Sequence, residues 1–235
     1  MTPDMKDRWS EHYQKLAVNS RDDRLRRFYQ QGVIAVDTPV AAVPFVALDF
    51  ETTGLDAEID EIISIGLVHF DLNRIRLRDS RYWLLKPDRE LTESSVPFHG
   101  ITHSQLDDAP DLNQILDAVL DEIAGKIVVV HYRYIEREFF DAAVKKRLGE
   151  GICFPVVDTM EQEAMLYRRG VISRIKRLTG FKPESIRLGD SRLRYNLPHY
   201  GQHHALTDAV ATAELLQAQI RHRYSETTPI SELWI

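Results

Sequence analysis

Residues 46–54 read VALDFETTG and place two carboxylates, Asp49 and Glu51, inside an otherwise apolar run. Side chains alternate across a strand, so the two acids share one face while Leu48 and Phe50 occupy the other. Neighbouring carboxylates repel each other, and each raises the pKa of the other unless a cation compensates them. Their hard oxygen atoms suit Mg²⁺ or Mn²⁺. The pattern predicts one edge of a metal-dependent active site.

Composition is typical of a soluble globular chain. The 235 residues, of which 43% are hydrophobic and 28% charged, suit one domain plus an appendage. No apolar run approaches the roughly 18 residues of a membrane helix, and residues 1–10 lack the apolar centre of a signal peptide. A single cysteine, Cys153, excludes an internal disulfide and favours a reducing compartment. We therefore expect a cytoplasmic protein that does not bind membranes.

The formal net charge of −6 argues against a protein that coats nucleic acid through bulk electrostatics. It does not exclude an enzyme that holds only a strand end, because bound cations would neutralise the acids of the site locally. Basic residues gather at 168–177 and 187–194, where solvated surface is the simplest interpretation.

Hydrophobic periodicity predicts an α/β fold. Three candidate strands joined by short polar turns form an antiparallel meander and cover residues 45–50, 62–70 and 75–86. Further strands at 127–131 and 154–157 alternate with helices at 112–124, 136–148, 159–168 and 205–222. Residues 181–202 are rich in turn-forming and basic residues. This order implies a mixed five-stranded sheet flanked by helices.

The chain divides into three parts: an N-terminal helical arm with its linker (1–43), a catalytic domain (44–223) and a short C-terminal tail (224–235). In the arm, Trp9, Tyr13 and Phe28 recur at roughly helical spacing. They could dock a protein partner or pack against the chain's own domain, and self-packing is the more common outcome.

Two further acids could join the first pair. Asp208 lies in the early turns of the last helix, behind His203 and His204. A histidine at the helix entrance could take a proton from an attacking water, whereas His204, one turn from Asp208, could pair with it structurally. Glu136 follows the apolar strand 127–131 and begins a helix. It lies where α/β sheets bind ligands, or it simply balances the helix dipole.

Together these segments resemble the DEDDh 3′–5′ exonucleases, which include the proofreading epsilon subunit of bacterial replicative polymerase, oligoribonuclease and RNase T. The resemblance covers residues 44–223 and implies a ribonuclease-H-like fold. It is carried by the order of five segments: DFETTG at 49–54, FHGIT at 98–102 with DAP at 108–110, HYRYIE at 131–136, VDT at 157–159 and HHALTD at 203–208.

The resemblance also implies roles for the acids. Asp49 would bridge two divalent ions (Mg²⁺ or Mn²⁺), Glu51 and Asp208 would complete the shell of the first, and Glu136 would support the second. His203 would be the general base. The sibling class carries a tyrosine at the position of His204, so the histidine class is the better match.

The implied substrate is a nucleic acid 3′ end, most simply single-stranded or frayed DNA, released as 5′-mononucleotides. RNA or oligoribonucleotides are the alternative within the enzyme class. A polymerase-associated nucleic-acid-binding subunit with weakened catalysis is the alternative outside it. The residues expected to contact substrate are Thr52, Gly54, Leu55, Phe98, His99, Tyr132 and Arg133.

The second acidic motif departs from the family pattern His-Asn-Ala-x-Phe-Asp. Here Tyr132 and Arg133 replace asparagine and alanine, and Glu136 replaces aspartate. The extra methylene of glutamate predicts a bias toward Mn²⁺, because Mg²⁺ demands stricter octahedral geometry. The short tail lacks the extended segment expected of a tethered proofreading subunit, which favours a stand-alone enzyme. The sequence does not indicate an oligomeric state.

Overall fold

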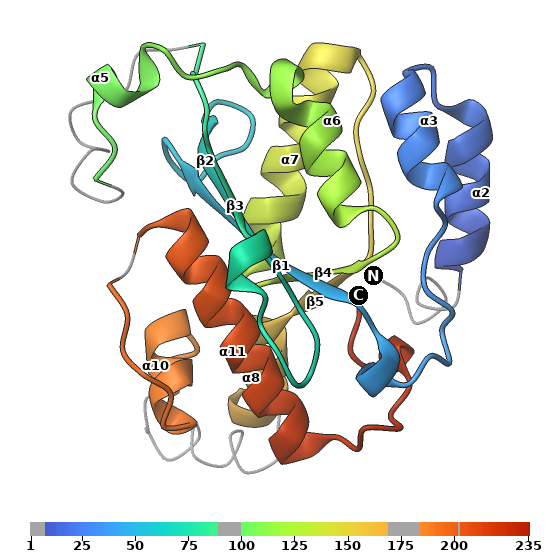
Figure 1. The fold of residues 1–235 in the computed structure, drawn as a ribbon, viewed down its shortest axis with the longest axis vertical. Coiled ribbons are helices and arrows are strands. Elements are labelled where there is room, and N and C mark those ends of the chain that lie inside the picture. The colour runs from blue at the N-terminus through green and yellow to red at the C-terminus, as the bar shows by residue number, and fades with distance from the viewer. Residues whose placement is uncertain (1–7, 89–99, 169–183, 202) are drawn as a thin grey trace.

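A mixed five-stranded sheet forms the centre of the molecule (Figure 1). The computed structural model describes residues 8–88, 100–168, 184–201 and 203–235. The strands are β1 (Phe45–Thr52), β2 (Ile62–Phe70), β3 (Arg81–Leu84), β4 (Ile127–Val130) and β5 (Val156–Asp158), in the spatial order β3-β2-β1-β4-β5. Pairing is antiparallel from β1 to β2 and β3, and parallel from β1 to β4 and β5. The predicted mixed sheet is confirmed.

Helices cover both faces of this sheet. Figure 1 shows α6 (Leu112–Ile123) and α7 (Arg133–Leu148) on one side, and α8 (Thr159–Tyr167), α10 (Leu188–Arg194) and α11 (Ala205–Arg223) on the other. The shorter elements are η1 (Val40–Ala42), η2 (Leu77–Asp79), α5 (His103–Leu106) and η3 (Ile230–Glu232). None of the helices in the described ranges combines the length and apolar character needed to cross a bilayer.

Three predicted elements differ from the structure. The third strand is only β3, because η2 interrupts the predicted range 75–86 and the Ser80 hydroxyl donates to the Leu77 carbonyl at 2.8 Å. Helix α7 begins at Arg133 instead of Glu136, because Asp158 accepts the first free backbone N–H groups. Helix α10 occupies part of the segment predicted to be turns.

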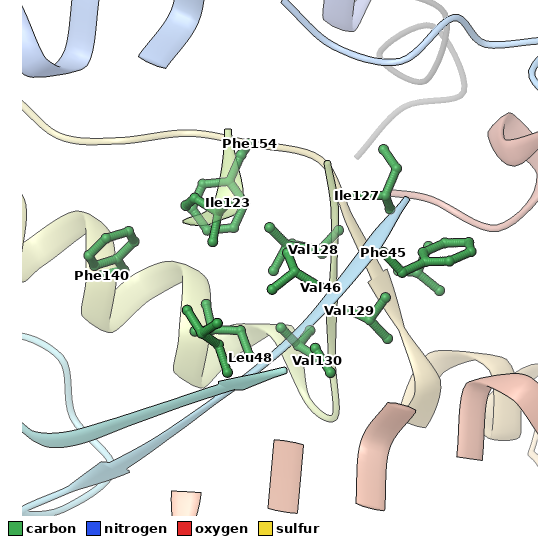
Figure 2. Packing of buried hydrophobic residues seen from close by; sticks show 14 of the residues in the cluster. Phe45, Val46, Leu48, Ile123, Ile127, Val128, Val129, Val130, Phe140 and Phe154 are labelled. Carbon is green, nitrogen blue, oxygen red and sulfur yellow. The ribbon is translucent and has the colours of Figure 1, made fainter. Parts of the chain in front are cut away.

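Strand alternation sends the even-numbered and the odd-numbered residues of β1 to opposite faces. Figure 2 shows Val46 and Val128 on the side of Phe140 of α7, and Phe45 on the other side of the strands. Phe50 continues the α7 face, with its ring 5.8 Å from that of Phe140. The odd-numbered residues, including Asp49 and Glu51, consequently face α11.

Gly66 allows α11 to approach this acidic face closely. It lies opposite Asp49 in the β1–β2 pairing. A Cβ at Gly66 would lie 2.2 Å from backbone atoms of Ala205 and Leu206, at the start of α11. Ala205 and Ala209 are themselves fully buried. Small residues on both elements therefore bring the first turns of α11 onto the sheet, and Asp208 with them.

The N-terminal arm forms two helices, α2 (Trp9–Asn19) and α3 (Asp23–Gln30), that pack beside α6 (Figure 1). Trp9, Tyr13 and Phe28 are buried, and Arg27 pairs with Asp117 of α6 at 2.8 Å. The structure thus shows the self-packing alternative, in which the aromatic face of the arm is not available for docking a partner.

The C-terminal tail also packs on the domain. Trp234 is fully buried, and the Ile235 N–H donates to the Val156 carbonyl of β5 at 2.9 Å. Trp9 and Trp234 belong to the same hydrophobic cluster as the strands. The division of the chain into an arm (1–43), a catalytic domain (44–223) and a tail (224–235) stays a prediction.

Replacing Gly66 with alanine should destabilise the protein by about 1–3 kcal/mol, because the added methyl group meets rigid backbone instead of a movable side chain. Urea unfolding followed by tryptophan fluorescence measures this. Gly201→Ala is the matched control, since a Cβ there meets open space. Equal stability of the two variants would contradict the close packing of α11 on β2.

Candidate active site

The acids predicted from the sequence converge at one edge of the sheet. The parallel strands β1 and β4 end at the same edge, and α7 and α11 both begin there. One carboxylate oxygen from each of Asp49, Glu51 and Asp208 lies within 4.8 Å of the others. Among the described residues these three form the group of acids close enough to share a cation.

A β-bulge ends the strand that carries the first two acids. Glu51 pairs with Ser64 of β2, but Thr52 pairs with Ile62, so the register shifts between Glu51 and Thr52. Bulges re-aim side chains and often lie beside active sites. Here the bulge falls directly after the second acid of the cluster.

Burial raises the pKa values of all four acids, and repulsion within the cluster adds to the shift for Asp49 and Glu51. Burial raises the pKa of Asp49 well above its usual value, and the charges of Glu136, Asp208 and Glu51 raise it further. Burial, followed by the charge of Asp208, raises the pKa of Glu51 to about 7. Burial also raises the pKa of Asp208, although the His203 N–H opposes it. Without a bound cation, negative charge on these carboxylates is therefore disfavoured at neutral pH.

Glu136 lies beside the group of three but is not part of it. Its side chain is 2% exposed, and its Oε2 atom has no hydrogen-bond partner among the described residues. Burial raises the pKa of this carboxyl well above its usual value, and Asp158 adds to the shift. An unpartnered buried carboxylate oxygen is costly in a folded protein unless a ligand satisfies it.

This donor set fits a divalent metal ion. Three carboxylates meet within 4.8 Å, and a fourth, Glu136, leaves a buried oxygen without a partner. Each is a hard oxygen ligand of the kind that Mg²⁺ and Mn²⁺ prefer. Asp49 interacts with both parts, since Glu136 contributes to its pKa shift as Asp208 and Glu51 do.

The two histidines before α11 have different surroundings. His203 is exposed, and its backbone N–H donates to Asp208 Oδ2 at 2.8 Å. It has a left-handed φ of 69°, which is uncommon outside glycine and asparagine. His204 instead stacks on Tyr82 of β3, with ring centroids 4.6 Å apart. Only His203 lies at the cavity described below.

Asp158 holds the turn that presents Glu136. It is buried, accepts the N–H groups of Tyr132 and Arg133 at 3.2 and 3.1 Å, and also caps α8. This turn includes Tyr132 at a φ of 94°, a strained conformation for an aromatic residue. Strain of this kind persists only where surrounding contacts enforce it, as Asp158 does here.

His131 lies at the start of this turn, and both of its ring nitrogens have hydrogen-bond partners. Its Nδ1 atom lies 2.8 Å from the Thr159 hydroxyl, and its Nε2 atom lies 3.1 Å from the Ile186 carbonyl. Burial lowers the pKa of His131 to about 4, so the ring is neutral at physiological pH.

A cavity of about 530 Å³, called the site cavity below, opens over the acids. Its walls include Asp49, Glu51, Glu136, Asp208 and His203. Helix α10 and the segment after it supply walls that the sequence did not predict as site residues: Arg187, Leu188, Leu193, Leu197, His199 and Tyr200. The only signal for them was a set of leucines within a basic, turn-rich segment.

The predicted substrate-binding residues lie in three different surroundings. Tyr132 lines the site cavity. Thr52 is the last residue of β1, and its hydroxyl donates to the Gly54 carbonyl at 2.6 Å. Leu55 lies in the connection after β1 and is 85% exposed. Leu55 borders a separate cavity. Phe98 and His99 lie outside the described residues.

The guanidinium of Arg133 is already engaged in the structure. It pairs with Asp158 at 3.2 Å and with Glu161 at 3.7 Å, and it donates to the Tyr134 hydroxyl at 2.9 Å. Its predicted contact with a substrate phosphate would compete with these partners.

Comparisons with known proteins agree on one family. A family model described as an exonuclease, RNase_T, matches residues 46–216. The DNA polymerase III subunit epsilon of Treponema pallidum is 31% identical over 180 residues, which cover 77% of this chain and 78% of that protein. The PolC-type DNA polymerase III of Thermotoga petrophila is 30% identical over 77% of this chain, which spans only 12% of that polymerase.

A solved structure shows the same fold at lower identity. The nuclease domain of 3′hExo, a DEDDh family member bound to rAMP, aligns with a TM-score of 0.62 and 16% identity. The alignment covers 77% of this chain and 92% of that one. At this identity the likeness concerns the fold.

The raised pKa of Glu51 predicts a measurable pH dependence of stability. Between about pH 4.5 and 7 the folded protein keeps a proton that the unfolded chain has released, so metal-free stability should fall as pH rises. His131, kept neutral by burial, contributes the opposite slope between about pH 4 and 6.5. The effect is therefore measured as the difference in melting temperature between wild type and Glu51→Gln, in which His131 is unchanged.

Relative to Glu51→Gln, wild type should lose stability across this window. Added Mn²⁺ should restore more stability above pH 7 than at about pH 5, because ligand carboxylates must be deprotonated. The prediction fails if the melting temperatures of wild type and Glu51→Gln change with pH in parallel and Mn²⁺ stabilises wild type equally at about pH 5 and above pH 7.

Proposed function

The chain belongs to the RNase T exonuclease family, as its resemblance to the DEDDh 3′–5′ exonucleases predicted, and from this membership we propose its activity. It is a metal-dependent 3′–5′ exonuclease that hydrolyses phosphodiester bonds from the 3′ end of single-stranded or frayed DNA and releases 5′-mononucleotides. The observation that carries the proposal is the meeting of Asp49, Glu51 and Asp208 within 4.8 Å beside the unpartnered, buried Glu136.

The acids divide into two overlapping ligand sets. Glu51 and Asp208 would hold one ion, Glu136 would hold a second, and Asp49 would contribute to both, which accords with its electrostatic interaction with all three. When bound, two divalent ions stabilise the charge that develops on the attacking and leaving oxygens. The side chains themselves would fix the positions of the reacting groups in the site cavity.

His203 is the proposed general base. It is exposed at the cavity wall, where its ring can reach an attacking water and accept its proton. Its backbone is tied to Asp208 by the 2.8 Å hydrogen bond, so the base and an acid of the cluster move as one unit. His204 is the weaker candidate because its ring is stacked on Tyr82.

Substrate contacts are proposed for Tyr132, which lines the site cavity, and for Thr52, Gly54 and Leu55 at the end of β1 and just after it. Phe98 and His99 stay predictions from the motif resemblance, and Arg133 would need to exchange Asp158 for a phosphate. DNA is the first choice because the relatives named above are DNA polymerase III proteins.

A polymerase could be a partner of this chain, by analogy with the epsilon subunit of Treponema pallidum. It would have to bind elsewhere than the buried aromatic face of the N-terminal arm. For its location we propose the cytoplasm.

Degradation of 3′-labelled and 5′-labelled strands tests the proposed function. Single-stranded DNA should be shortened from its 3′ end in Mg²⁺ or Mn²⁺ but not in chelator, and duplex DNA should be degraded more slowly. Asp49→Ala should abolish the activity, because this acid belongs to both ligand sets. Persistent hydrolysis in chelator or in Asp49→Ala would overturn the mechanism, and faster hydrolysis of RNA would reassign the substrate.

The two histidines provide a matched pair for the general base. His203→Ala should lower kcat by about 100- to 10,000-fold, the usual contribution of a general base, while Mn²⁺ binding is retained. His204→Ala should keep most of the activity, since it removes only the stack on Tyr82. The assignment fails if the larger loss of kcat occurs in His204→Ala.

Glu136 should set the preference between the two metals. Shortening it by a methylene in Glu136→Asp should lower the ratio of the Mn²⁺-supported rate to the Mg²⁺-supported rate, because aspartate suits stricter octahedral geometry. Initial rates at saturating metal measure this ratio. An unchanged ratio would rule out the proposed Mn²⁺ bias.

A further inference from the structure

Two exposed tyrosines flank the start of α7 at the rim of the site cavity. Tyr132 is 43% exposed and Tyr134 is 45% exposed, and their ring centroids lie 5.3 Å apart. Tyr132 lines the cavity, so the pair extends from its wall to the outer surface. Large aromatic side chains that remain exposed beside a nucleic-acid site are suited to stacking on unpaired bases.

Ion pairs and hydrogen bonds of neighbouring groups hold the two tyrosines in place. The Arg133 guanidinium lies 4.5 Å from the centre of the Tyr134 ring and is held by Asp158 and Glu161. Asp158 also holds the backbone of Tyr132 in its left-handed conformation. A side chain ordered before binding loses less entropy when a ligand arrives. In this structure Arg133 thus supports the Tyr134 ring.

Arg187 supplies an uncommitted positive charge at the same cavity. It is exposed at the start of α10 and lines the site cavity. Within the described ranges its guanidinium has no ion pair or hydrogen bond. By contrast, the other arginine of the cavity wall, Arg192, is bound to Glu214 at 2.6 Å and to the Ala211 and Pro198 carbonyls.

We propose that Tyr132, Tyr134 and Arg187 form a strand-binding subsite outside the reaction centre, specific for single-stranded nucleic acid. The tyrosine pair stacks on an unpaired base of the strand that leads away from the terminal nucleotide, and Arg187 binds a backbone phosphate. The subsite favours single strands because a paired base offers no free face for stacking. It rests on the proposed exonuclease function for its place in the reaction, but its binding is measurable without turnover.

The test separates strand binding from the reaction centre. Binding of a labelled single strand is measured by fluorescence anisotropy in Ca²⁺. Hydrolysis of the p-nitrophenyl ester of thymidine 5′-monophosphate, which carries no strand, reports on the reaction centre alone. The variants are Tyr134→Ala, Tyr134→Phe and Arg187→Ala. Arg78→Ala is the matched charge control, because Arg78 is exposed on η2 and is not part of the cavity wall.

Tyr134→Ala should weaken strand binding about tenfold, within the range of base–aromatic stacking, and Tyr134→Phe should restore it. Arg187→Ala should reduce the slope of log affinity against log salt by about 0.7, the value for one phosphate contact on a single strand. Arg78→Ala should leave that slope unchanged. Hydrolysis of the ester should remain at the wild-type rate in Tyr134→Ala, whose side chain is not part of the cavity wall, and in Arg78→Ala.

Unchanged strand binding in Tyr134→Ala and Arg187→Ala would overturn the subsite. A parallel loss of ester hydrolysis in Tyr134→Ala would also overturn it, because the tyrosine would then act on the fold or the centre. If the wild type hydrolyses neither ester nor strand, the proposed function fails, while the binding comparison still decides the subsite.

Discussion

The crowding of four carboxylates, three partly buried and one fully buried, is the constraint around which this structure is organised. Asp49, Glu51, Asp208 and Glu136 come from three elements, and burial raises the pKa of each. Keeping all four of these acids charged at neutral pH is costly without a compensating cation. Strand alternation, the absence of a side chain at Gly66 and the turn held by Asp158 all serve to bring them together.

Another buried acid of the same chain is neutralised by the protein's own side chains. Glu163 of α8 is fully buried, which alone would raise its pKa, but hydrogen bonds from Arg194, Gln219 and Tyr195 and the charge of Arg223 lower it. That acid joins α8, α10 and α11 and is compensated by the protein. The active-site acids have no such arginines among the described residues, so only bound protons or a bound cation can neutralise them.

The sequence predicted the parts of the site that depend on local pattern. Alternation placed Asp49 and Glu51 on one face, and helical periodicity placed Asp208 at the start of the last helix. It failed where distant contacts decide the outcome. The partner of Arg133, Asp158, lies 25 residues away, and α10 is held by Arg192 through Glu214, 22 residues later. No short-range pattern encodes such pairs, so Tyr134 and Arg187 became visible as candidate binding residues only in three dimensions.

The central claim is that this acidic cluster binds two divalent ions. Anomalous diffraction from crystals grown with Mn²⁺ and a 5′-mononucleotide tests it most directly. The account predicts two manganese peaks, one among Asp49, Glu51 and Asp208 and one beside Glu136. A single peak, or none at these carboxylates, would contradict it.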